Sequence, residues 1–180
     1  MSKIIEIINK IFDERFIQTS HDSISEPKEK MKRRILKGGI IDEKILICHL
    51  DIERNAQVSD LFPYLRGDSL NHGFKGMKRV CDYAIFVEEE ETLFVLLIEL
   101  KKGKESSREQ LEVSEPLIDF IFSRARILKH LNTNYTVRKI GITDVVEKKE
   151  TINRGEVIYD ENNYTKLYNS NILYLRKLLH

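Results

Sequence analysis

The sequence predicts an α/β protein with a central mixed β-sheet flanked by helices, and three of its patterns lead to this prediction. Isoleucines recur at helical spacing between Ser2 and Phe16. Two runs of β-branched and aromatic residues, Tyr83 to Val87 and Leu93 to Ile98, flank a polar tip, as in a β-hairpin. A long helical pattern then leads to an alternating stretch, Tyr135 to Val146. With a strand before the hairpin, the element order is α-β-β-β-α-β.

The composition is that of an ordinary globular domain. Of the 180 residues, 41% are hydrophobic and 33% are charged, so the chain is expected to fold as one domain, residues 1–180. The formal net charge of +1 provides no global positive field for nucleic acid. Basic residues do form local clusters, which are more often solvated faces than binding surfaces: Lys28 to Lys37, Lys75 to Arg79, Lys101 to Lys104 and Arg124 to Lys129.

The two cysteines, Cys48 and Cys81, lie in apolar stretches and are expected to be buried thiols. Two cysteines are too few for a disulfide framework or a structural zinc site. The chain shows no basic leader with an apolar run, and no stretch approaches the roughly 18 apolar residues of a membrane span. These features predict a cytoplasmic protein without a membrane partner.

The first helix is expected from Ser2 to Phe16, with Ser2 as its N-cap. A second helix is expected from a cap at Ser25, with Pro27 in its first turn and a stop at Gly38-Gly39. This second helix is strongly basic. It would either present cations to phosphates or be a solvated helix with its inward positions at Met31, Ile35 and Leu36.

The first strand of the sheet is expected from Lys44 to Ile52. It contains His49 and Asp51, but a lone histidine in an apolar strand is more often structural than catalytic. The segment from Asn55 to Gly76 is irregular, and it would be either a substrate wall or lid, or a surface excursion without function.

The helix after the hairpin is expected from about Glu105 to Leu131, with a kink at Pro116. Because it links two strands, those strands should be parallel. At the C-terminus, a short edge strand is expected from Glu156 to Asp160, and a strand or a closing helix from Ile172 to Leu179.

The hairpin places polar residues in an apolar setting. If its turn is centred between Glu90 and Glu91, Asp82 lies directly opposite Glu99, where paired Cβ atoms are about 4.5–5.5 Å apart. Lys101 is two residues beyond Glu99, so the strand period of two puts it on the same face.

Two carboxylates at this distance repel each other, so either one takes up a proton or a cation lies between them. Oxygen ligands with open positions suit Mg²⁺, and a lysine beside them would orient water or stabilise developing negative charge. The pattern therefore indicates metal-assisted hydrolysis of phosphodiesters. The plain alternative is a cross-strand ion pair or a solvated strand end.

The residues Asp82 and Glu99-Leu100-Lys101 resemble the motif of the PD-(D/E)xK nuclease superfamily, over roughly Met77 to Val146. The resemblance implies a restriction-endonuclease-like core and a Mg²⁺- or Mn²⁺-dependent nuclease. Asp82, Glu99 and the Leu100 carbonyl would bind the metal, and Lys101 would assist the nucleophile. The sequence departs from the motif at Cys81, which stands where the family has proline.

The resemblance also implies a polar residue on the following helix, here Gln110 and less surely Ser107. Family members often have an extra acid on an N-terminal helix, for which the candidates are Glu6, Asp13, Glu14, Glu26 and Glu29. The expected partner is nucleic acid, more DNA than RNA, and cleavage of both strands would call for a homodimer or a larger complex. Restriction and phage defence are the biological settings that fit by analogy.

Two other functions remain open. In the first, the chain is a nuclease-like scaffold that binds nucleic acid or a partner protein but does not catalyse cleavage. In the second, it is an unrelated α/β protein in which Asp82, Glu99 and Lys101 form only an ion pair at an edge strand. Phosphate-binding glycine motifs and a nucleophile elbow do not occur in the sequence.

Overall fold

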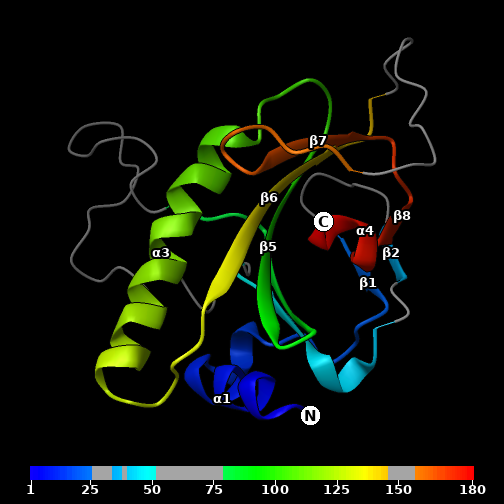
Figure 1. The fold of residues 1–180 in the computed structure, drawn as a ribbon. Coiled ribbons are helices and arrows are strands. Elements are labelled where there is room, and N and C mark those ends of the chain that lie inside the picture. Colours follow the sequence, from blue (N-terminus) through cyan, green and yellow to red (C-terminus); the bar gives the residue numbers. More distant parts are fainter. Residues whose placement is uncertain (26–33, 38–39, 52–78, 146–156) are drawn as a thin grey trace.

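The computed structural model describes residues 1–25, 34–37, 40–51, 79–145 and 157–180, and these residues form two β-sheets with flanking helices (Figure 1). The larger sheet has the strand order β3-β4-β5-β6-β7, and the smaller has the order β1-β2-β8. Both sheets are mixed, with parallel and antiparallel neighbours. The predicted α/β class with a central mixed sheet is confirmed.

The larger sheet contains β3 (Ile45–His49), β4 (Tyr83–Glu89), β5 (Thr92–Lys101), β6 (Tyr135–Thr143) and β7 (Tyr164–Tyr168). Strands β3, β4 and β5 form an antiparallel meander, whereas β6 and β7 add parallel to β5. Every residue of β5 from Leu93 to Leu100 is buried. Such a continuous apolar run needs cover on both faces of the sheet.

Helices cover one face of the larger sheet. They are α1 (Lys3–Ile11) and α3 (Arg108–Ile127), and α3 lies along β5 and β6 (Figure 1). The other face is covered by β1 (Ser23–Ile24), β2 (Arg34–Lys37), β8 (Ile172–Tyr174) and α4 (Leu175–Leu179), with two separate apolar clusters on the two faces. We call these the helical face and the small-sheet face.

The first helix is shorter than expected. Ser2 is its N-cap as predicted, and the Ser2 hydroxyl accepts the Ile5 N–H. The chain leaves the helix at Phe12 because the backbone there is extended. A short 3-10 turn, η1 (Glu14–Phe16), then follows and buries Phe16.

The predicted second helix is wrong where the structure describes it. Arg34–Lys37 is strand β2, antiparallel to β1 and parallel to β8, and it is followed by the 3-10 turn η2 (Asp42–Lys44). Burial alternates with period two, so that Arg34 is fully buried and Ile35 is 45% exposed. Tertiary pairing with β8 therefore overrides the helical pattern. Residues 26–33 and 38–39 lie outside the described residues.

The hairpin forms as predicted, with Tyr83 paired to Ile98 at its open end and Glu89 paired to Thr92 at its turn. Glu90 and Glu91 both have positive φ angles, 49° and 65°. Two central residues in the left-handed region are the mark of a type I′ turn, whose twist matches that of the strands it joins.

Three boundaries differ from expectation. Helix α3 runs from Arg108 and ends at Ile127, and the helix is continuous through Pro116. The edge strand is β7, and the described residues 157–160 are not in a strand, because the Asp160 carboxylate accepts the N–H groups of Asn162 and Tyr164 and forms a turn there. Residue 156 lies outside the described residues. The C-terminal segment is both a strand and a helix, β8 and then α4.

Candidate active site

The hairpin brings the three motif residues to its open end. Asp82 directly precedes β4, and the confirmed register continues from the Tyr83–Ile98 pair to place Asp82 opposite Glu99. The next pair on this face, Ala84 and Leu97, belongs to the apolar cluster of the helical face. By strand alternation, Asp82, Glu99 and Lys101 therefore share the face on which α3 packs.

The two acids are held by main-chain hydrogen bonds across the hairpin. The Asp82 N–H donates to Glu99 Oε2 at 3.2 Å, and the Leu100 N–H donates to Asp82 Oδ2 at 2.6 Å. Each carboxylate is thus fixed by the strand that bears the other. Both acids are buried, Asp82 to 4% and Glu99 to 1% exposure.

Lys101 supplies a positive charge at this pair. Its Nζ lies 2.6 Å from Glu99 Oε1, and its side chain is 13% exposed. The lysine is therefore the member of the trio that reaches solvent, while the acids lie beneath it. A charge-assisted contact of this length is strong in a poorly solvated place.

The pKa of Glu99 is raised from its usual 4.5 to about 7. Burial is the largest cause, and the charge of Asp51 adds to it. The hydrogen bond and charge of Lys101 and the hydrogen bond from Asp82 act in the opposite direction. Near neutral pH, the Glu99 carboxyl is therefore partly protonated, and it would release this proton to bind a cation.

Helix α3 anchors the segment that leads into Asp82, residues 79–81. The Cys81 N–H donates to the Ser114 hydroxyl at 2.7 Å, and the Ser114 hydroxyl donates to the Gln110 carbonyl at 2.6 Å. The Gln110 side-chain amide donates to the Val80 carbonyl at 3.2 Å. Gln110 therefore supports the backbone two residues before Asp82.

Ser107 precedes the first turn of α3 and is 1% exposed. Its hydroxyl lies 3.2 Å from the Tyr164 hydroxyl of β7. Both hydroxyls lie over Gly141, the residue of β6 that is paired with Glu99. The start of α3 thus sits beside Glu99 because β6 has no side chain at this point.

The other sequence candidates lie elsewhere or bind other groups. The ring of His49 stacks on Tyr83 at 4.4 Å, on the small-sheet face, which agrees with its structural interpretation. Of the candidates for an extra acid, Glu6 pairs with Lys10 and Asp13 with Arg15. Ser2 contacts Glu88 at the turn end of the hairpin, so α1 begins at the end away from Asp82.

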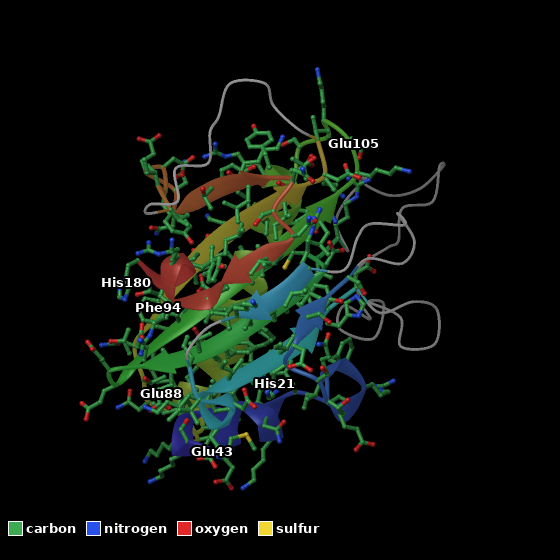
Figure 2. The ribbon with its side chains drawn as sticks, turned by 90° about the vertical axis from the view of Figure 1, so that its right-hand side faces the viewer. His21, Glu43, Glu88, Phe94, Glu105 and His180 are labelled. Atoms are coloured by element: carbon green, nitrogen blue, oxygen red, sulfur yellow. The ribbon has the colours of Figure 1, made fainter. Side chains whose placement is uncertain are left out.

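Glu88 and Phe94, near the turn end of the hairpin, lie on the left side in Figure 2, and Glu105, just beyond β5, lies at the upper end. The motif residues belong to that upper end. Glu26, Glu29 and the irregular segment 55–76 lie outside the described residues.

Three residues beside the motif were not predicted from the sequence: Ser114, Gly141 and Tyr164. Gly141 had a usable signal, because an isolated glycine in a strand often marks the close approach of another segment. Ser114 and Tyr164 had none, since only the packing of α3 and β7 brings them to the motif. Asp51 was considered with His49, whereas the structure relates its charge to Glu99.

Within the described ranges, no group of three or more His, Cys, Asp and Glu side chains is arranged to hold a metal ion. The same part of the chain contains no helix that is both long and apolar enough to cross a bilayer. Comparison with family models, curated proteins and solved structures gives no match for this chain.

Proposed function

We propose that the protein is a metal-dependent phosphodiesterase of the PD-(D/E)xK type with a restriction-endonuclease-like core. The observation that supports this most is the buried trio Asp82, Glu99 and Lys101 on one sheet face, at the end where α3 begins. The order α1, β3, β4–β5, α3, β6 agrees with the core expected for that type, with β1 and β2 inserted after α1.

The donor set fits a hard divalent cation. Asp82 and Glu99 would hold Mg²⁺ or Mn²⁺ with the Leu100 carbonyl, and substrate phosphate and water would complete the shell. Two acids and a carbonyl are fewer side chains than a closed protein cage needs, which suits an ion that keeps open positions. When bound, the ion supplies a Lewis acid that polarises the phosphodiester and lowers the pKa of water.

The residues of the chain have distinct tasks in this proposal. The main-chain hydrogen bonds fix Asp82 and Glu99 side by side, so little reorganisation is needed when a cation binds. Lys101, at the solvent side of the acids, orients the attacking water and stabilises the charge that develops on the phosphate.

The substrate in this proposal is nucleic acid, DNA rather than RNA. The overall charge of +1 gives no general attraction, so the local cations matter. Arg79, Lys102 and Lys104 are exposed, and they lie close in sequence to Asp82 and Lys101. Contacts from such residues to phosphates would position the backbone without reading its sequence.

The test is a cleavage assay with fluorescent single-stranded DNA, duplex DNA and RNA, with Mn²⁺, Mg²⁺ or EDTA. We expect cleavage only with metal. Asp82→Asn, Glu99→Gln and Lys101→Met should each lower the rate by about 10² or more, since each removes charge stabilisation in the transition state.

Lys3→Met is the control for Lys101, because Lys3 is exposed and lies on α1, which begins at the end of the sheet away from Asp82. It should change substrate affinity at most and leave the maximal rate near that of the wild type. Absence of metal-dependent cleavage on all three substrates, or wild-type rates in Lys101→Met, would remove the enzyme proposal.

The second candidate is a scaffold without turnover that binds nucleic acid or a partner protein. It is favoured by the 2.6 Å pair of Lys101 with Glu99, which neutralises one acid without any metal. In that case binding of DNA should persist in the double variant Asp82→Asn/Glu99→Gln, with no cleavage by the wild type. If Asp82, Glu99 and Lys101 form only a structural ion pair, neither binding nor cleavage of nucleic acid would be seen.

A further inference from the structure

Helix α3 has an apolar stripe on its outward face in addition to its buried one. Val113, Phe120 and Ile127 are 43%, 59% and 77% exposed. They are seven residues apart, so they lie nearly in line along one side of the helix. Solvent-exposed stripes with this repeat are typical of helices that pack against another helix.

This stripe is not needed for the fold of the chain itself. The core-facing side of α3 is already formed by six other buried residues: Leu111, Ser114, Leu117, Ile118, Phe122 and Ala125. The exposed aromatic Phe120 contacts only the Arg124 guanidinium among the interactions described for its ring, at 5.5 Å. A large apolar side chain with so little cover is the kind of residue that anchors an interface.

The charges beside the stripe are divided by sign along the helix. On one flank, at the helical angles next to the stripe, Glu109 and Glu112 belong to the first half of the helix. Arg126 follows on the same flank at its C-terminal end. All three residues are exposed. One end of this face is therefore acidic and the other basic.

A face of this kind is complementary to itself when reversed. We infer that the outward face of α3 is a contact surface for a second copy of this chain, with the two α3 helices packed antiparallel. The twofold axis passes near Phe120, so each Val113 faces Ile127 of the other copy. In the same register Glu112 faces Arg126 of the other copy.

Two details agree with this register. The Asp119 carboxylate, which is closest to the axis on that flank, accepts a hydrogen bond of 2.6 Å from the Tyr135 hydroxyl and is thus held by its own chain. Glu112 pairs with Arg108 at 2.8 Å, but both side chains are partly exposed. Such an ion pair contributes little stability, so Glu112 can bind Arg126 of the other copy at little cost in free energy.

The arrangement has a consequence for the candidate sites. Each site lies at the N-terminal end of its α3, so an antiparallel pair places the two sites at opposite ends. For 20 residues of helix this is about 30 Å along the axis. The two sites of such a dimer would act on separate phosphodiesters. The inference itself does not depend on the proposed function.

The test is sedimentation of the full chain over a range of concentrations. We expect a concentration-dependent dimer, and we expect Phe120→Glu to weaken it at least about tenfold in dissociation constant. Ile41→Glu is the matched control, because Ile41 is 65% exposed but lies outside α3. It should dimerise as the wild type does. Circular dichroism and melting temperature should show that both variants fold.

Charge reversal tests the register. Glu112→Arg and Arg126→Glu should each weaken the dimer, and the double variant should restore it, since every facing pair regains opposite charges. A chain that is monomeric at all concentrations, a dimer unaffected by Phe120→Glu, or a double variant no better than the single ones would overturn the inference. None of these outcomes bears on whether the trio at Asp82 cleaves phosphodiesters.

Discussion

Gly141 lies so close to Ser107 that a β-carbon at position 141 would be 1.9 Å from the Ser107 hydroxyl oxygen. That distance is far inside van der Waals contact, and the same β-carbon would lie 3.1 Å from the Tyr164 hydroxyl. Because Gly141 pairs with Glu99, the contact fixes the distance between the start of α3 and the candidate site.

Gly141→Ala should therefore destabilise the chain by about 1–3 kcal/mol, as overpacking of a buried contact does. Ser107→Gly removes the Ser107 hydroxyl and β-carbon, the two atoms that would lie closest to the new β-carbon, at 1.9 and 3.0 Å. The double variant should therefore recover most of the loss. Chemical denaturation of the wild type, the two single variants and the double variant measures this coupling. Additive losses in the double variant would contradict the contact.

Ser114→Ala tests the link between α3 and the segment that leads into Asp82. The variant leaves the buried Cys81 N–H without its acceptor, which should cost about 1–3 kcal/mol of unfolding free energy. The control is Ser123→Ala, which changes an exposed serine on the same helix and should be nearly neutral. Equal effects of the two substitutions would show that the hydrogen bond does not stabilise the chain.

The turn of the hairpin should accept a stabilising change. Glu90 and Glu91 both adopt left-handed conformations, which are unfavourable for residues with a β-carbon. Glu90→Asn with Glu91→Gly introduces the pair preferred in type I′ turns and should raise stability by about 1 kcal/mol. A lower melting temperature would contradict the assigned turn.

The raised pKa of Glu99, about 7 against 4.5, predicts how stability without metal depends on pH. The folded state binds this proton more tightly than the unfolded state between those values. Stability from Glu99 is therefore largest below pH 4.5, declines as the pH rises through 7 and is lost above it.

This pH effect is measured from melting temperatures in EDTA, as the difference between wild type and Glu99→Gln. The wild type should lose stability relative to the variant between pH 5 and pH 8, by a few kcal/mol in all. Added Mn²⁺ should reduce the loss if Glu99 binds the ion. A constant difference across this pH range would rule out the raised pKa.

Both thiols should be unreactive in the folded protein. Burial raises the pKa of Cys48 to about 12 and raises that of Cys81 further still, and both side chains are fully buried. Since the thiolate is the reactive form, iodoacetamide at pH 8 should label neither residue until the chain is unfolded. Rapid labelling of either cysteine in the native state would contradict the burial.

Local signals in the sequence were sufficient for the helix cap at Ser2, for the hairpin and for its register. In each case the cause is short-range: a hydroxyl caps the nearest N–H groups, and a two-residue turn fixes which residues face each other across a hairpin. The meeting of Asp82 and Glu99 follows from that register alone, and this is why it was predictable.

The tertiary structure decided the rest. Residues 34–37 form a strand because β8, more than 130 residues later, offers hydrogen bonds to them, and no local pattern reveals such a distant partner. Three further features depend on how α3 packs: the burial of the two acids, the hydrogen bond from Cys81 to Ser114, and the close contact of Ser107 with Gly141. The sequence by itself determined which charges face each other, and the packed fold determined how strongly they interact, because desolvation arises only when distant segments exclude water.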